Sequence, residues 1–177
     1  MMPADSPIVA FYRGAGCDQS GRLIAEIHRF SNRELEQCHD YIQWLFPLIV
    51  RSQFNPNAPI LVEADIALFT SDPVLRVNFR RSLEKILGFY GYEIVANNPV
   101  QIFESEQWGN RSIKWISDGN HNYMRITRIL RSAYLLGFED YAQAFIDRLL
   151  KLRDSPYGRI IGARMFAFWH EAVSRNG

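Results

Sequence analysis

Apolar residues recur at the spacing of an α-helix through most of this chain, and the pattern is clearest between residues 72 and 90. One face of such a helix would carry five apolar side chains: Phe79, Leu83, Ile86, Leu87 and Tyr90. Ser71-Asp72-Pro73 supplies a cap and a first-turn proline, and Gly91 supplies a residue that ends a helix in the left-handed region. The spacing therefore predicts a long amphipathic helix over residues 72–90.

A second helix is predicted over residues 31–46. Ser31 and Glu34 form the pattern of a capping box, in which the Ser oxygen accepts one free backbone N–H and the Glu carboxylate accepts another. Pro47 ends the pattern, because its ring clashes with the preceding helical turn. Leu35, Ile42 and Leu45 would share the apolar face of this helix.

The remaining segments complete an all-α prediction. Helical spacing recurs over 22–30, 61–69, 108–116, 120–137, 138–152 and 157–173. Residues 3–22 contain three glycines and two prolines and are predicted to be irregular, with 8–12 as the only candidate strand. Residues 92–104 read as a loop, with a small hairpin as the alternative. The chain is predicted to form a single compact domain over 1–177, with about seven helices and little or no strand.

Composition restricts the class of partner and the compartment. Lys and Arg total 20 against 19 Asp and Glu, so no global charge attracts nucleic acid or an anionic membrane. Cys17 and Cys38 are too few for a disulfide framework, which fits a reducing compartment. No apolar segment reaches the roughly 20 residues that span a bilayer. We therefore expect a soluble, cytoplasmic protein without a transmembrane segment.

Familiar enzyme and cofactor motifs are missing from the sequence. Gly14-x-Gly16 lacks the third glycine of a dinucleotide-binding turn, and no phosphate-binding loop or nucleophile elbow occurs. The histidines and cysteines show no metal-ligand spacing. We expect no cofactor and no metal.

Three separated stretches resemble the conserved region of the opioid growth factor receptor family. They are His39-Asp40-Tyr41-Ile42-Gln43-Trp44-Leu45-Phe46-Pro47-Leu48, Leu87-Gly88-Phe89-Tyr90-Gly91, and Asn122 with Arg125-Ile126-Thr127-Arg128-Ile129-Leu130. Their order and spacing agree with the family, and the resemblance covers roughly residues 11–173. The first stretch is long and combines Trp, Gln and Pro in a fixed order, which makes a chance match improbable.

The resemblance implies a fold more firmly than a ligand. Eukaryotic receptors of this family are known for binding an enkephalin peptide in growth control, and they carry long additional segments. This chain resembles a short, free-standing, microbial version of the region. We expect a non-enzymatic interaction domain that binds a peptide, a protein or a small anionic ligand; neither the ligand nor the oligomeric state follows from the sequence.

Two groups of polar residues are candidates for the ligand site. A helix over 120–137 would place His121, Arg125 and Arg128 in one row with Ser132, and arginine offers forked donors to a phosphate or carboxylate. The second group comes from the first motif: His39, Gln43 and Trp44. If the two helices pack together, the groups would face each other across a groove.

Each functional interpretation has a plainer alternative. The arginine row would be a solvated face or would form internal ion pairs with Glu36, Asp40 or Glu84, while Trp44 would fill the core and His39 and Gln43 would satisfy buried backbone groups.

Two other classes of function stay open. One is an enzyme that uses His39 as acid or base with Arg125 and Arg128 as an anion clamp. The other is weak nucleic-acid binding through Arg76, Arg80, Arg81 and Lys85, which nearby glutamates and the net charge disfavour.

Overall fold

The computed structural model describes residues 5–174, and the chain falls into two compact units, Met1–Lys85 (unit 1) and Ile86–Gly177 (unit 2). Each unit is built mainly from helices, so the all-α class is confirmed in its main feature. The described residues contain eleven α-helices rather than about seven, and two short strands. That the whole chain forms one domain stays a prediction.

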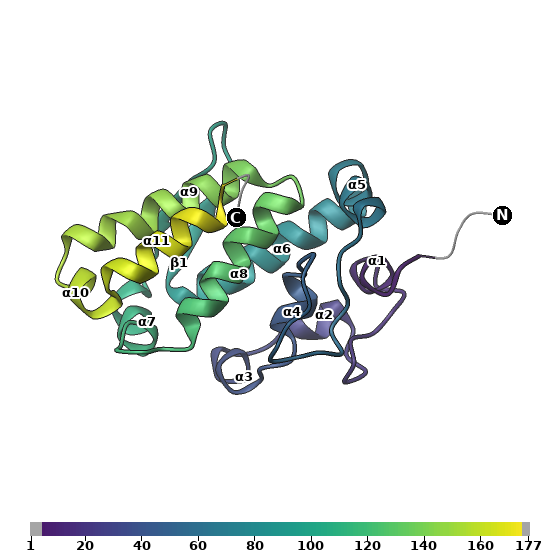
Figure 1. Cartoon of the computed structure of the whole chain (residues 1–177), viewed down its shortest axis with the longest axis horizontal. Helices are drawn as coiled ribbons and strands as arrows, with labels where there is room; N and C mark the ends of the chain where they lie inside the picture. Colours follow the sequence, from purple (N-terminus) through teal and green to yellow (C-terminus); the bar gives the residue numbers. More distant parts are fainter. Residues whose placement is uncertain (1–4, 175–177) are drawn as a thin grey trace. The chain divides into compact units, whose positions relative to one another are not determined.

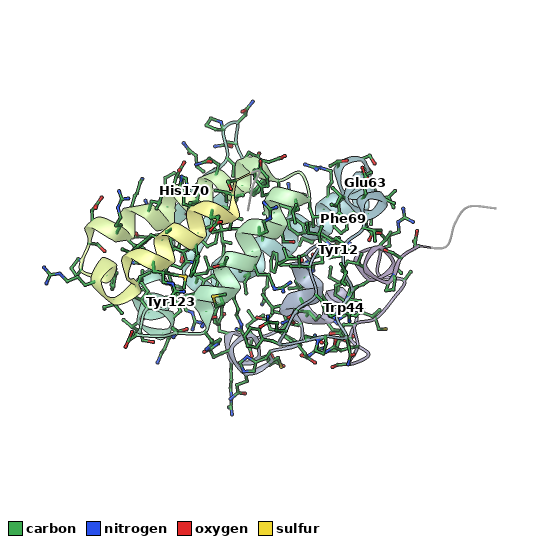
Figure 2. The ribbon with its side chains drawn as sticks, viewed as in Figure 1. Tyr12, Trp44, Glu63, Phe69, Tyr123 and His170 are labelled. Carbon is green, nitrogen blue, oxygen red and sulfur yellow. The ribbon has the colours of Figure 1, made fainter. Side chains whose placement is uncertain are left out.

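Unit 1 consists of short helices joined by long loops (Figure 1). In chain order they are α1 (Pro7–Tyr12), α2 (Ile24–Ile27), α3 (Asn32–Gln37), α4 (Ile42–Leu45), α5 (Glu63–Ser71) and the first part of α6 (Pro73–Tyr90). Aromatic side chains fill the core of this unit. The ring of Tyr12 lies 4.8 Å from that of Phe69 (Figure 2), and Phe79 lies 5.8 Å from Phe46.

The prediction of irregular chain over residues 3–22 was wrong at α1. Ser6 caps this helix by accepting the N–H of Val9 at 3.3 Å, and Pro7 occupies the first turn, where its missing N–H costs nothing. Phe11 and Tyr12 are fully buried. Packing in the core therefore stabilises a helix whose own length is marginal.

The predicted continuous helix over residues 31–46 is interrupted. Its capping box is present, since Ser31 Oγ accepts the N–H of Glu34 and the Glu34 carboxylate accepts the N–H of Ser31. However, α3 ends at Gln37 and α4 begins at Ile42. The Tyr41 hydroxyl donates to the carbonyl of Leu35 at 3.0 Å inside the core. This tertiary hydrogen bond favours the interrupted chain over the continuous helix that the apolar spacing predicts.

Helix α6 agrees with its predicted range. Asp72 Oδ1 accepts the backbone N–H of Val74 at 2.8 Å and that of Leu75 at 3.3 Å, so Asp72 caps the helix. The five predicted apolar side chains are all buried. Gly91 follows with φ of 92°, as expected for a helix-ending glycine.

Unit 2 begins with the last turn of α6 and a small antiparallel hairpin. The strands are β1 (Tyr92–Val95) and β2 (Gln101–Glu104), with Tyr92 opposite Glu104 and Val95 opposite Gln101. The loop predicted over residues 92–104 is thus a hairpin, and the alternative that the sequence left open holds. Strand pairing across the Asn97-Asn98-Pro99 turn satisfies backbone groups that a loop would leave to solvent.

The rest of unit 2 is helical. Its elements are α7 (Trp108–Trp115), α8 (Asn122–Leu135), α9 (Glu139–Leu150), a 3-10 helix (Lys151–Asp154), α10 (Tyr157–Ile161) and α11 (Ala163–Ala172). Helices α8, α9 and α11 lie side by side (Figure 1). The predicted helix over 157–173 is two helices, because Gly162 adopts φ of 83° between them. Within residues 5–174, none of the helices combines the length and the apolar character needed to cross a membrane.

Candidate functional site

An ion-pair network in unit 1 ties the loop after α1 to the first motif. Asp18 Oδ1 accepts the backbone N–H groups of Ser20 and Arg22, each at 2.9 Å. The Arg22 guanidinium donates to Asp18 Oδ2 at 2.7 Å and to Asp40 Oδ1 at 2.8 Å, and the Ser20 hydroxyl donates to Asp40 Oδ2 at 2.6 Å. The carboxylate of Asp40 therefore acts as a structural anchor.

The surroundings of Arg22 and Asp40 favour the charged form of each side chain. Burial alone would lower the pKa of Arg22, but its hydrogen bonds to Asp18 and Asp40 outweigh that effect and raise the pKa. Burial alone would raise the pKa of Asp40, but hydrogen bonds from Ser20 and Arg22 lower it below its usual value. Both groups are ionised at neutral pH.

Trp44 packs into unit 1 as its plainer interpretation expected. The side chain is buried, its ring centroid lies 5.3 Å from that of Phe11, and its Nε1–H donates to Gln19 Oε1 at 3.3 Å. Trp44 belongs to α4 and is labelled in Figure 2. Its indole thus has a polar partner as well as an apolar environment, which is what a buried tryptophan requires.

Gln43 is also buried and has a partner within the unit. The Asn55 side-chain amide donates to the carbonyl of Asp40 at 3.3 Å and approaches Gln43 Oε1 at 3.5 Å, a weak contact. His39, in contrast, lies exposed in the segment between α3 and α4. Of the three motif residues, His39 is the one most accessible to a ligand.

In unit 2, Arg125 is buried on α8 at 6% exposure. Its guanidinium donates to Asn122 Oδ1 at 3.4 Å, and the same oxygen accepts the Tyr90 hydroxyl at 3.3 Å. Asn120 Oδ1 accepts both the backbone and the side-chain N–H of Asn122 at 3.0 Å. A solvated face, one of the plainer alternatives, is therefore wrong for Arg125. Helix spacing alone could not show that this side of α8 is covered.

Arg128 is only partly exposed, and burial lowers its pKa to about 10. The guanidinium remains protonated at neutral pH, so its charge is held in partly desolvated surroundings. Ser132 is fully buried, whereas His121 is exposed at the start of α8. An anion placed beside Arg128 would be stabilised more strongly than one beside a fully solvated arginine.

The predicted site residues divide between the two units. His39, Gln43 and Trp44 belong to unit 1, and His121, Arg125 and Arg128 belong to unit 2. The common groove that would join them stays a prediction.

Sequence reasoning assigned no role to an exposed apolar surface in the loop between α4 and α5. Phe54 is 87% exposed, Val50 62% and Ile49 48%, and these three side chains are called the apolar loop surface below. Nothing in the sequence pattern marks these residues as exposed, because the apolar pair Ile49-Val50 also suits a core. Only the path of the chain decides their exposure.

Hydrogen bonds from the same loop hold the apolar loop surface in place. Ser52 Oγ accepts the N–H of Phe54 at 3.3 Å and that of Asn55 at 3.2 Å, while Ser52 and Asn55 are themselves buried. Arg51 donates to the carbonyl of Pro56 at 2.6 Å. Two polar residues of the loop, Ser52 and Asn55, are thus buried, whereas its apolar residues Ile49, Val50 and Phe54 are exposed.

Comparison with known proteins places this arrangement in a family. A family profile described as the opioid growth factor receptor (OGFr) conserved region matches residues 5–155. The chain belongs to the opioid growth factor receptor family. It is 34% identical to the mouse (Mus musculus) opioid growth factor receptor over 137 residues, and 32% identical to the human (Homo sapiens) receptor over 174 residues. No solved structure matches.

The shared region is a fraction of each relative. The alignments cover 75% of this chain and 21% of the mouse receptor, and 93% of this chain and 25% of the human receptor. Opioid growth factor receptor-like protein 1 from mouse is 32% identical over 118 residues, which cover 66% of this chain and 25% of that protein. This chain therefore spans about a quarter of the length of these opioid growth factor receptor family members.

Proposed function

We propose that this chain is a non-enzymatic interaction domain that binds a peptide or an extended segment of another protein. The names of its relatives describe receptors for a growth factor, and the matched region is the one they share with this chain. The observation that carries the proposal is the apolar loop surface, where Phe54 is 87% exposed. Large apolar side chains that are exposed close together in the sequence are candidates for contact with a partner.

The hydrogen bonds within this loop favour binding. A loop that is already ordered by Ser52 and Asn55 loses little conformational freedom when a ligand arrives. Covering the ring of Phe54 would remove apolar area from water, which is a main source of affinity in peptide complexes.

For a small anionic ligand, we propose a site within unit 2, at Arg128 together with Arg125 and His121. The support is the partly buried charge of Arg128, since burial lowers the pKa of its guanidinium. In unit 1, His39 is exposed at the start of the first motif and would offer a further polar contact. The buried side chains of Gln43 and Trp44 would hold that motif in place. Among the residues that the structure describes, no observation favours the enzyme alternative over binding.

The apolar loop surface can be tested with a random peptide library displayed on phage and panned against the intact chain. We expect enriched peptides to carry aromatic or aliphatic residues, and Phe54→Ala to weaken their binding about tenfold or more. Ile113→Ala is the matched control, because Ile113 is 64% exposed on α7 in unit 2. Peptides that bind both variants equally well, or a panning that enriches nothing, would overturn the proposal.

The arginine site is tested separately, with a set of short acidic peptides. Arg128→Ala should weaken their binding and flatten its dependence on salt, Arg128→Lys should restore part of both, and the exposed Arg159→Ala should change neither. Two results together would make Arg128 a structural residue: Arg128→Ala unfolds the chain, and Arg128→Lys binds the acidic peptides no better than a variant with a neutral residue at this position.

A further inference from the structure

A partly buried polar cluster in unit 2 lies where the hairpin meets α9, and none of its residues belongs to the proposed binding sites. Tyr92 on β1 and Glu104 on β2 are directly opposite in the strand register, so their side chains project from the same face of the hairpin. Arg148 on α9 contacts Glu104, with 3.3 Å between Nη2 and Oε1. The ring of Tyr92 lies 5.9 Å from that of Phe145, one turn earlier on α9.

Aromatic side chains from two further helices lie next to the cluster. The ring of Trp108 on α7 lies 4.9 Å from that of Tyr92, and Tyr157 on α10 lies 6.2 Å from Trp108. Burial raises the pKa of Tyr92, and among its charged neighbours Glu104 raises it further while Arg148 lowers it. The Tyr92 hydroxyl is therefore within electrostatic reach of both members of the ion pair.

Two polar atoms of this cluster are buried without a hydrogen-bond partner anywhere in residues 5–174. They are the Tyr92 hydroxyl oxygen and Arg148 Nε. Tyr92 as a whole is only 2% exposed, and the side chain of Arg148 is 20% exposed. Leaving such groups without partners destabilises the folded state, so native interiors rarely do so.

The chemistry of the two atoms defines what would satisfy them. Arg148 Nε–H is a donor only, and the Tyr92 hydroxyl has one proton to donate, so both groups call for an acceptor. Arg148 and Glu104 already neutralise each other, so an added anion would leave a net negative charge in a poorly solvated place. A neutral oxygen atom meets both requirements.

We propose that Tyr92 and Arg148 together bind one neutral oxygen atom between β1 and α9, supplied by a buried water molecule or by an uncharged hydroxyl- or carbonyl-bearing ligand that replaces it. Trp108 and Tyr157 would form the aromatic wall against the carbon skeleton of such a ligand, as aromatic side chains do in many small-molecule sites. This site is independent of the proposed peptide-binding function.

Crystals of the intact chain test the occupant directly, in three soaks. Without additive, we expect a water oxygen within about 3.2 Å of both the Tyr92 hydroxyl and Arg148 Nε. In isopropanol, the alcohol oxygen takes that position if the site admits a ligand, and water stays there if it does not; either result supports a neutral acceptor. Bromide in that position, seen by its anomalous scattering, or no density at all would overturn the proposal.

Stability in urea gives an independent test in solution. Tyr92→Phe removes one of the two donors, and we expect it to lower the folding equilibrium constant about tenfold. Ser112→Ala is the matched control, because the Ser112 hydroxyl is also buried without a hydrogen-bond partner within residues 5–174 but is not one of the two proposed donors, so its loss should be neutral or favourable. A Tyr92→Phe variant as stable as the parent chain would show that the hydroxyl binds nothing.

Discussion

Burial lowers the pKa of His28 to about 4, and the positive charges of Arg81 and Lys85 act in the same direction. His28 Nε2 lies 2.9 Å from the hydroxyl of Ser82, which donates its own proton to the carbonyl of Asn78 at 3.1 Å. A neutral imidazole can make this hydrogen bond to the Ser82 hydroxyl, and burial favours that neutral form. This single side chain links the stability of unit 1 to pH.

The linkage has a definite sign. In the unfolded chain His28 takes up a proton near its ordinary pKa of 6.5, but in the folded chain it does so only near pH 4. The unfolded state therefore binds more protons between these values, and the free energy of unfolding should fall as pH falls from 6.5 to about 4. Allowing for the partial exposure of the ring, we expect a loss of roughly 2 kcal/mol.

Urea unfolding of His28→Gln at neutral and at acidic pH would measure this effect. The variant should lose less stability on acidification than the parent chain, while His170→Gln, at an exposed position, should follow the parent. Parallel behaviour of all three proteins would show that His28 is not held neutral by the fold.

The positions of the individual candidate site residues could be predicted only in part. Trp44 was predicted as a ligand contact, with core packing as the plainer alternative, and the structure shows it buried in the core. The burial of Arg125 did not follow, since a basic residue on a helix is ordinarily solvated and its hydrogen bond to Asn122 depends on the fold. Gln19 and Asn55, the partners of Trp44 and Gln43, carry no signal in the sequence.

At the scale of elements, helix ends were more predictable than helix continuity. The boxes and caps at Ser31 and Asp72 depend on residues within one turn, and both are present. The interruption after Gln37 and the break at Gly162 depend on contacts or conformations that apolar spacing does not encode. Local chemistry therefore predicted the caps at Ser31 and Asp72 and the end of α6 at Gly91, while the interruption after Gln37 coincides with a tertiary hydrogen bond.

Asp72 allows the cap of α6 to be separated from an ion pair. Its Oδ1 caps the helix and its Oδ2 accepts from Arg13 at 2.8 Å. Asp72→Ala removes both interactions and should lower the free energy of unfolding by about 1 kcal/mol or more. Asp72→Asn keeps a good capping group and should lose clearly less, because an exposed ion pair contributes little. Equal losses in thermal or urea unfolding would mean that the cap is not the stabilising contact.

At the scale of the whole molecule, the family profile covers less chain than the fold uses. The match ends at residue 155, yet α10 and α11 follow it, and α11 packs against α8 and α9. Trp169 on α11 is fully buried, and its Nε1–H donates to the carbonyl of Tyr123 on α8 at 3.1 Å. Figure 2 places Tyr123 on that helix. The core of unit 2 therefore requires residues beyond the matched region.

A chain ending at residue 155 should lose the cooperative unfolding transition of unit 2. This transition can be measured by near-UV circular dichroism during unfolding in urea. In the full chain, Trp169→Ala should lower the free energy of unfolding by about 3 to 5 kcal/mol. Phe168→Ala, half-exposed on the same helix, should cost much less. A truncated chain that unfolds like the full chain would show that α11 is dispensable.

By itself the sequence determined the helical class, the caps, the long amphipathic helix and the family, because each depends on residues close together in the chain or on a short conserved pattern. Tertiary structure alone decided that Arg125 is buried, that Phe54 is exposed, and that Tyr92, Glu104 and Arg148 gather in one cluster. The physical reason is that burial and hydrogen bonding belong to pairs of residues far apart in sequence, and no local period records which of them meet.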